Sequence, residues 1–220
     1  TKGNDKLINE IVAILKQRKN KIPIERVDRK VIDNLTGKNV KHQGIIILAN
    51  KLKKKSFENV FYKMNYRVGV VLDKITDPNN VGSIYRSALC FDLDFIVNSE
   101  RGSSKETGAL LNSACGAFDK INTFYADNLV ATIREFKKNN WWVLGTDISA
   151  NIYINNFFSN YGDITKLLIV LGSEGGGVRR LTKEHCDFLV KIPMKKSNSL
   201  NVSNAAAIFF YEINKHLKLN

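Results

Sequence analysis

The chain contains 220 residues, which is enough for one sizeable domain or for one domain with a small appendage. Apolar residues make up 44% and charged residues 25%, a globular composition that excludes a wholly disordered chain. Lys and Arg outnumber Asp and Glu by 34 to 21, giving a net charge of +13. This charge predicts a polyanionic partner such as nucleic acid, although a solvated, Lys-rich surface accounts for it equally well.

The apolar runs, the first residues and the cysteines argue against a membrane protein, a secreted protein and a disulfide- or zinc-stabilised protein. Runs such as 167–171 and 205–211 are far shorter than the ~20 residues that span a bilayer, so no membrane segment is expected. The first ten residues are polar and lack the apolar core of a secretory signal. Cys90, Cys115 and Cys186 are widely spaced and odd in number, which predicts neither disulfides nor a zinc site. We expect a cytoplasmic protein without a bound metal.

The first part of the chain, residues 1–49, predicts a small α/β unit. Apolar side chains recur with helical spacing over 5–18, and an extended stretch follows at 22–27. A second helix is predicted over 29–35, before Gly37, and a strand-like run over 44–48. The polar, basic segment 50–66 then predicts a linker.

From Val68 onward, short β-branched runs alternate with helical patterns, which is typical of a parallel sheet covered by helices. We therefore predict an α/β domain over residues 67–220. The predicted strands are 68–73, 94–98, 141–146, 167–172 and 188–192, with a further short one near 122–125. The predicted helices are 81–91, 107–115, 128–138, 180–185 and 202–217.

A first polar motif runs from Asp73 to Arg86, where a strand passes through a Pro/Asn loop into a helix. Asn80 is the predicted N-cap of that helix, and Arg86 lies close enough to its start to face the same crevice. The alternative is that Asn80 only caps the helix and that Arg86 only pairs with a surface carboxylate.

A second motif follows the buried strand that ends at Gly172, where a glycine-rich loop begins a helix. Phosphate cradling is disfavoured, because Glu174 places a negative charge in the loop and the Lys-Ser/Thr of a P-loop is absent. A carboxylate there suits a ligand with hydroxyl, amide or cationic groups. A plain left-handed turn with a solvated Glu174 is the alternative.

A third motif spans residues 191–207 and consists of a strand end, a polar loop and a long helix. Ser199 or Asn201 is the predicted N-cap of this helix. The small residues 205–207 would let it pack closely against its neighbours. The simpler interpretation is a well-capped terminal helix with Met194 in the core.

Taken in this order, the three motifs resemble those of the SpoU/TrmH branch of the SPOUT methyltransferases. His42-Gln43-Gly44 and the segment 180–187 resemble the subgroup that methylates a guanosine ribose in bacterial 23S rRNA. The resemblance implies S-adenosylmethionine as cofactor, RNA as substrate and methylation of a ribose 2′-hydroxyl. It covers essentially the whole chain.

The resemblance also implies an architecture. In this family a parallel sheet ends in a deep C-terminal trefoil knot, and a domain similar to ribosomal protein L30e precedes it. His42 comes early for a complete domain of that kind, so we expect residues 1–49 to form a partial RNA-binding domain. The family acts as a homodimer packed through the knotted halves, for which the helix at 205–217 is the candidate contact.

Site residues follow from the same match, position by position. The resemblance implies that S-adenosylmethionine lies bent in the knot against Gly172, Ile192 and Leu200, with Gly145, Thr146, Ser173 and Met194 as neighbours. The positions that match the family's active-site polar residues are Asn80, Arg86, Glu174, Ser199 and Asn201. The loop before Ser199 is about one residue shorter than expected, and Asn204 replaces a usually apolar residue, so we expect local adjustment there.

The chemistry implied by the resemblance requires no metal, because in-line methyl transfer depends mainly on positioning two bound partners. Arg86 would anchor the adjacent phosphate or polarise the 2′-hydroxyl, since a guanidinium is a reluctant base. Two alternatives remain: a tRNA 2′-O-methyltransferase of the same family, and a non-catalytic RNA-binding or ribosome-assembly factor. A third alternative, an α/β enzyme that binds nucleotide phosphates, is disfavoured because the glycine loop of this chain lacks the Walker-type lysine.

Overall fold

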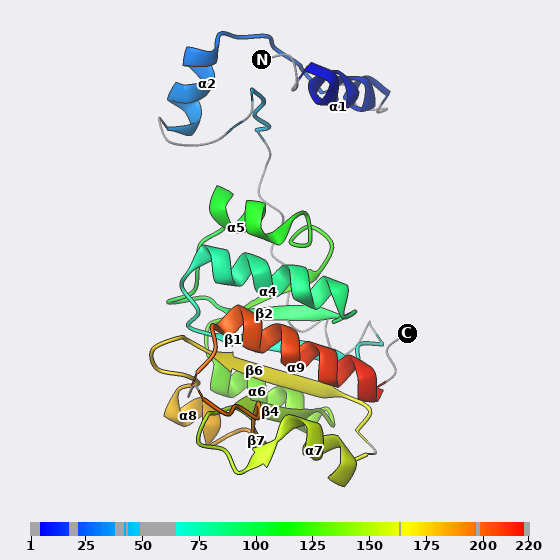
Figure 1. Ribbon diagram of the computed structural model, residues 1–220, viewed down its shortest axis with the longest axis vertical. Helices are drawn as coiled ribbons and strands as arrows, with labels where there is room; N and C mark the ends of the chain where they lie inside the picture. Colours follow the sequence, from blue (N-terminus) through cyan, green and yellow to red (C-terminus); the bar gives the residue numbers. More distant parts are fainter. Residues whose placement is uncertain are drawn as a thin grey trace. The chain divides into compact units, whose positions relative to one another are not determined.

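The computed structural model of the chain describes residues 5–17, 22–37, 42, 44–48, 65–162, 164–196 and 199–217. The chain divides into two compact units, Thr1–Leu52 and Lys53–Asn220. The first two helices belong to the first unit, and the sheet belongs to the second (Figure 1). Most of the predicted linker, 50–66, lies outside the described residues.

The first unit contains the two predicted helices, α1 (Asp5–Gln17) and α2 (Arg29–Thr36). The His42 ring accepts the Gly44 N–H at Nδ1, 2.9 Å away, so its Nε2 carries the proton and donates to Asp33 Oδ1 at 2.8 Å. His42 therefore ties α2 to the segment that follows it. The prediction of a strand at 44–48 was wrong. A strand needs a partner strand, and the described residues of this unit offer none.

Within the described residues of the second unit, seven parallel strands form one sheet in the order β3-β2-β1-β6-β4-β7-β5. The strands are β1 (Val68–Asp73), β2 (Phe95–Ser99), β3 (Asn122–Ala126), β4 (Trp142–Thr146), β5 (Ile152–Tyr153), β6 (Leu167–Gly172) and β7 (Phe188–Lys191). Strands β1 and β6 are buried at every position, which explains their continuous apolar sequences. The predicted parallel α/β sheet is confirmed.

The predicted strands differ from the observed ones mainly at their ends. For example, β2 begins at Phe95 rather than at Asp94. The Asp94 carboxylate instead accepts hydrogen bonds from the backbone N–H groups of Arg67 and Val68, at 2.7 and 2.8 Å. Strand β5 was not predicted, because two residues are too few to show an alternating pattern.

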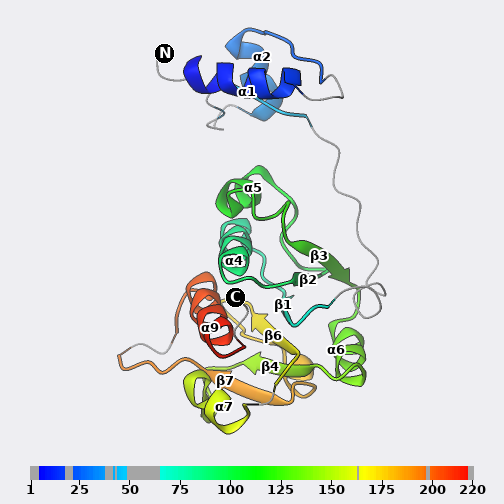
Figure 2. The same cartoon turned by 90° about the vertical axis from the view of Figure 1, so that its right-hand side faces the viewer.

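Helices cover both faces of the sheet (Figure 2). They are α4 (Pro78–Cys90), α5 (Gly108–Ala114), α6 (Leu129–Lys138), α7 (Ile154–Asn160), α8 (Arg180–Lys183) and α9 (Val202–Leu217). Apolar side chains of α4, α5, α7 and α9 share one buried cluster with the sheet, whereas those of α6 form a second cluster on the opposite face. Helix α7 was not predicted. Helix α8 is shorter than predicted, because the His185 N–H turns back to Thr182 O.

The start of α4 corrects one prediction about Asn80. The helix begins at Pro78, and its N-cap is Asp77, whose side chain accepts the Asn79 N–H at 2.9 Å. Aspartate is a strong N-cap and proline is favoured at the first helical position, so the helix starts three residues earlier than predicted. Asn80 therefore is not the cap, and its side chain is available for other contacts.

None of the helices in the described parts of the chain is long and apolar enough to cross a membrane. Among those same residues, no group of three or more His, Cys, Asp or Glu side chains could hold a metal ion. Because all strands are parallel, their carboxyl ends meet at one edge of the sheet, which is where α/β proteins place ligands.

Candidate functional site

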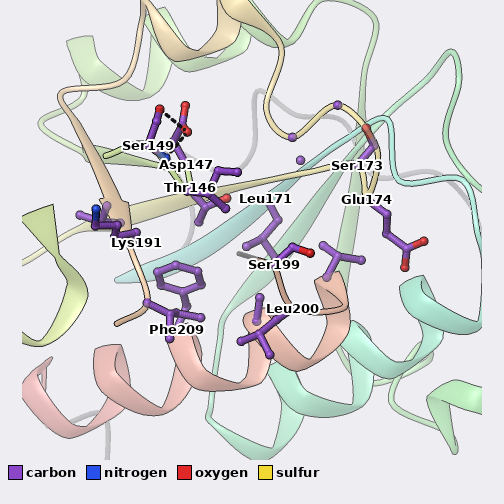
Figure 3. Close-up of a pocket in the computed structure, with 18 of the residues that line it drawn as sticks. Thr146, Asp147, Ser149, Leu171, Ser173, Glu174, Lys191, Ser199, Leu200 and Phe209 are labelled. Atoms are coloured by element: carbon purple, nitrogen blue, oxygen red, sulfur yellow. Dashed lines mark hydrogen bonds between the residues drawn. The ribbon is translucent and has the colours of Figure 1, made fainter. Parts of the chain in front are cut away.

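A cavity of about 460 Å³ lies at the carboxyl ends of β4, β6 and β7, beside the start of α9. In Figure 3, Leu171, Leu200 and Phe209 lie in its middle, with Asp147 and Ser149 on one side and Glu174 on the other. The lining comprises residues 146–149, 171–177, 183, 190–192, 194, 199, 200, 202, 205 and 209. The cavity thus has an apolar centre between two polar ends.

The glycine-rich loop after β6 forms one wall. Ser173 and Gly177 exchange both backbone hydrogen bonds, at 2.8 and 3.2 Å, and Gly177 adopts a φ of +61°. A Cβ at Gly172 would lie 2.0 Å from the backbone of Gly177 and Val178, so only glycine fits there. The loop is a closed turn that carries Glu174.

Glu174 holds together the three polar motifs. Its Oε1 accepts a short hydrogen bond from Asn80 Nδ2 and another from Asn201 Nδ2, at 3.0 Å. Asn201 Nδ2 also lies 3.0 Å from Asn80 Oδ1. These three side chains come from α4, the glycine-rich loop and the start of α9, so residues far apart in the chain converge.

Asn201 has a second role, at the start of α9. Its Oδ1 accepts the backbone N–H of Ser203 at 2.9 Å, which is an N-cap contact, and its backbone oxygen accepts the Ala205 N–H. The side-chain oxygen is therefore used to cap the helix, while the amide nitrogen faces Glu174. This confirms Asn201, one of the two predicted residues, as the cap.

An ion pair between a buried carboxylate and a half-exposed arginine fixes the base of the glycine-rich loop. Asp73, at the end of β1, is fully buried and pairs in register with Gly172. Its carboxylate accepts the Arg179 Nε–H at 2.7 Å and the Arg179 backbone N–H at 3.1 Å. Gly172 precedes the loop and Arg179 follows it. Asp73 therefore contacts both ends of the loop, Gly172 by strand pairing and Arg179 by hydrogen bonds.

A second ion pair forms the other polar end of the cavity. Lys183 Nζ lies 2.5 Å from Asp147 Oδ2, and the backbone N–H and hydroxyl of Ser149 both donate to Asp147 Oδ1 at 2.8 Å. Burial alone would raise the pKa of Asp147, but the bonds from Lys183 and Ser149 outweigh it and hold that pKa below its ordinary value. Asp147 is therefore an ionised carboxylate near neutral pH.

The structure brings most of the predicted site residues together. Glu174 and Ser199 line the cavity, and Asn80 and Asn201 adjoin it through their bonds to Glu174. Of the residues expected to contact the cofactor, the following line it: Thr146, Gly172, Ser173, Ile192, Met194 and Leu200.

Two predicted site residues lie elsewhere. Gly145 does not line the cavity, since a Cβ there would point at Cys186 and Leu189, within 2.8 Å of both side chains. Arg86 lies six residues beyond Asn80 on α4, more than one and a half turns away. Its guanidinium is exposed, and its described contact is with Cys115 Sγ at 3.7 Å.

Sequence reasoning missed several residues of the cavity. Asp147 and Ser149 follow directly after a predicted strand, so their place at the carboxyl edge was a usable signal. Lys183 and Phe209 carry no such signal, because their helical positions are fixed only by the packing of α8 and α9. The Asp73–Arg179 pair spans 106 residues and was also invisible in the sequence.

The fold and the site together indicate an α/β protein that binds a ligand at the carboxyl edge of its sheet. A cavity with an apolar centre opens at the carboxyl edge of a parallel sheet, beside three converging polar side chains. Such a site can hold a large organic ligand and present it to a second, polar molecule.

Comparison with known sequences identifies the family. The sequence model of the "SpoU rRNA Methylase family" matches residues 67–211, and that of the "RNA 2'-O ribose methyltransferase substrate binding" domain matches residues 1–55. The chain belongs to the SpoU rRNA methylase family.

Curated relatives agree with this assignment. A protein of Staphylococcus aureus, provisionally named a TrmH family tRNA/rRNA methyltransferase, is 34% identical over 94% of this chain and 82% of its own length. YacO of Bacillus subtilis, with the same provisional family name, is 35% identical over 89% of this chain and 78% of its own length.

Solved structures share the fold. An rRNA methyltransferase from Sinorhizobium meliloti aligns with a TM-score of 0.74 at 21% identity, over 96% of this chain and 78% of its own. The SpoU methyltransferase AviRb from Streptomyces viridochromogenes, solved in complex with the cofactor AdoMet, aligns with a TM-score of 0.66 at 22% identity. That alignment covers 75% of this chain and 63% of AviRb.

Proposed function

We propose that this protein transfers a methyl group from S-adenosylmethionine to a ribose 2′-hydroxyl in RNA, at a guanosine of 23S rRNA. The observation that carries the proposal is the ring of bonds among Asn80, Glu174 and Asn201 at one end of an apolar cavity. This arrangement suits a methyl donor in the cavity and a ribose at its polar end.

The residues of the cavity fit S-adenosylmethionine. Its volume, about 460 Å³, lies in the usual range for organic ligands, ~300–1,000 Å³. Leu171, Leu200 and Phe209 offer apolar surface for a base, and the polar groups of Asp147 and Ser149 lie beside it for the polar part of the ligand. Gly172 lets the loop backbone close tightly at the cavity wall.

When bound, S-adenosylmethionine would supply an electrophilic methyl group on a positively charged sulfur. Asn80 and Asn201 both bond to Oε1 of Glu174, and no bond to Oε2 comes from the residues that the structure describes, so Oε2 would accept a ribose hydroxyl. Ser199, which lines the cavity, would bond to the same sugar. The contribution of these residues is positioning, which lowers the barrier of an in-line transfer.

Arg86 would act on the RNA side of the reaction. Its exposed guanidinium would anchor the phosphate next to the acceptor ribose or polarise the 2′-hydroxyl. A guanidinium remains charged at neutral pH, so we assign the departing proton to water or to the phosphate rather than to Arg86.

The division of labour follows the two units. We propose that residues 1–49 form a partial L30e-like domain that selects the RNA, and that residues 67–220 form the methyltransferase domain with 50–66 as linker.

The deep trefoil knot, the homodimer through α9 and the cytoplasmic location also remain proposals. On α9, Ile208 and Tyr211 are exposed and would provide apolar surface for the dimer contact, and a monomeric mass by light scattering would contradict that contact.

A second substrate, tRNA, is favoured by the names of the curated relatives, which mention both tRNA and rRNA. The decisive experiment incubates the protein and tritiated S-adenosylmethionine with unmodified transcripts of 23S rRNA and of tRNA, followed by mapping of the ribose methyl. Methyl incorporation into 23S rRNA at a guanosine supports the proposal. Incorporation only into tRNA selects the second candidate, and none into either contradicts both.

A further inference from the structure

Arg179 is the residue that the proposed chemistry leaves unexplained. It follows the glycine-rich loop and is held twice by the same buried carboxylate, through its Nε–H and its backbone N–H, both bonded to Asp73. The backbone and the side chain are therefore both fixed. An arginine held in this way has little conformational freedom left to lose when it binds a further partner.

The outer half of the Arg179 guanidinium faces solvent. The side chain is 45% exposed, whereas Asp73 is 0% exposed. Among the residues that the structure describes, the bonds of this side chain engage only Nε, so both terminal Nη groups are available as donors. If Arg179 served only to neutralise Asp73, the Nη groups would have no role, although they form the part of the fork that matches a phosphate.

The position of Arg179 places these donors at the functional edge of the sheet. Asp73 ends β1 and lies in register with Gly172, the last residue of β6 and a wall of the cavity. Glu174, in the same loop, bonds to Asn80 and Asn201. Exposed Lys74 follows Asp73 directly, so a second cation emerges at the same strand end.

We propose that Arg179 binds a phosphate of the RNA backbone beside the acceptor nucleotide, and that Asp73 is a positioning residue that fixes its guanidinium. The inference rests on the proposed function and adds to it a docking contact on the RNA. An RNA strand carries one negative charge per nucleotide, and a pre-oriented arginine fork binds such an oxyanion bidentately.

The neighbouring Arg180 provides a matched control. It carries the same charge, but its side chain is 83% exposed, and within the described residues it pairs with Glu184, one turn away on the surface. Arg180→Gln removes one positive charge from the surface without removing a pre-oriented fork, so it shows how much RNA affinity a loss of net charge alone would cost.

Two variants test Arg179 without leaving a buried charge unpaired, because a lone Asp73 carboxylate would destabilise the fold. The double variant Asp73→Asn/Arg179→Gln replaces the ion pair with two amides. Arg179→Lys keeps the charge next to Asp73 but has no Nη groups. For both, thermal melting and calorimetric binding of S-adenosylhomocysteine verify the fold and the cavity.

The experiment measures filter binding of the full chain to unmodified 23S rRNA and tRNA transcripts between ~50 and ~300 mM KCl. We expect the double variant and Arg179→Lys to bind the preferred transcript about five- to tenfold more weakly than wild type. For the double variant, the slope of log affinity against log salt should be shallower by ~0.7–0.9. Arg180→Gln should stay within about twofold of wild type.

Unchanged RNA affinity in both Arg179 variants, or an equal loss in Arg180→Gln, would overturn the inference while methylation by wild type kept the proposed function intact. A wild-type protein that neither binds nor methylates the transcripts would remove the proposed function itself. If S-adenosylhomocysteine binding fell together with RNA binding, Arg179 would act on the cavity and the phosphate assignment would be wrong.

Discussion

At the scale of single residues, the site separates side chains that build it from side chains that face the substrate. Asn80, Glu174 and Asn201 bond to one another, so replacing any one of them removes a hydrogen-bond partner from the other two. Arg86 is exposed, and its contact in the described part of the chain is a weak one with Cys115, so its removal should leave the fold and the cavity unaffected.

Arg86→Ala is therefore expected to lower methyl transfer by at least ~100-fold, the usual cost of losing one oriented charge in an active site. Calorimetric affinity for S-adenosylmethionine should remain close to that of wild type. Arg134→Ala is the matched control. Arg134 is exposed on α6, which covers the face of the sheet opposite to α4, and it bonds to His185. Normal turnover in Arg86→Ala would show that this residue has no part in the reaction.

Cysteine reactivity tests the packing at single residues. Burial, with the charge of Asp187 nearby, raises the pKa of the Cys186 thiol to about 12, whereas Cys90 and Cys115 are exposed. Because the thiolate is the reactive form, iodoacetamide at pH 8 should modify Cys90 and Cys115 at least ~10-fold faster than Cys186. Raising the pH toward 12 should increase the Cys186 rate. Equal rates by mass spectrometry at pH 8 would contradict its burial.

At the scale of elements, the sequence predicted what local patterns encode. The continuous apolar runs of β1 and β6 and the repeats of α6 and α9 sufficed to place those elements. The sequence did not reveal that Asp77 rather than Asn80 caps α4, because several N-capping residue types lie close together there. Strand β5 and helix α7 are short and depend on packing against β7, which no local pattern records.

The glycine-rich loop allows a direct test of close packing. Gly172→Ala would place a Cβ 2.0 Å from neighbouring backbone, so we expect the loop to shift, S-adenosylhomocysteine affinity to fall by at least tenfold and stability to fall by ~1–3 kcal/mol. Gly175→Ala in the same loop has open space around its Cβ and should keep the wild-type melting temperature. An unchanged melting temperature and S-adenosylhomocysteine affinity in Gly172→Ala would contradict the close packing of Gly172 against the backbone of Gly177 and Val178.

The start of α9 separates capping from chemistry. Asn201→Ser keeps an N-cap oxygen but loses the amide that bonds to Glu174, so stability should change by less than ~0.5 kcal/mol. Methyl transfer should nevertheless fall at least tenfold. Asn201→Ala loses both contacts, so its unfolding free energy should fall by ~1 kcal/mol and its melting temperature should fall with it. If Asn201→Ser retained full turnover, the bond to Glu174 would have no catalytic importance.

At the scale of the whole molecule, the candidate site was predictable because the three motifs resemble a known family, and the polar cluster shows those motifs in contact. The resemblance could not reveal the orientation of Gly145, which faces Cys186 and Leu189, or the separation of Arg86 from the cluster. The first depends on which face of β4 the Gly145 Cα presents, and the second on how far along α4 Arg86 lies from Asn80. The Asp73–Arg179 and Asp147–Lys183 pairs likewise depend on packing between distant segments.

The most direct test is a crystal structure of the full chain with S-adenosylhomocysteine, the product left after methyl transfer. We predict that the ligand lies against Leu200 and Gly172, with its sulfur directed toward Glu174, Asn80 and Asn201. Ligand bound elsewhere, or a cavity around Leu200 that stays closed while calorimetry detects no binding, would contradict the account.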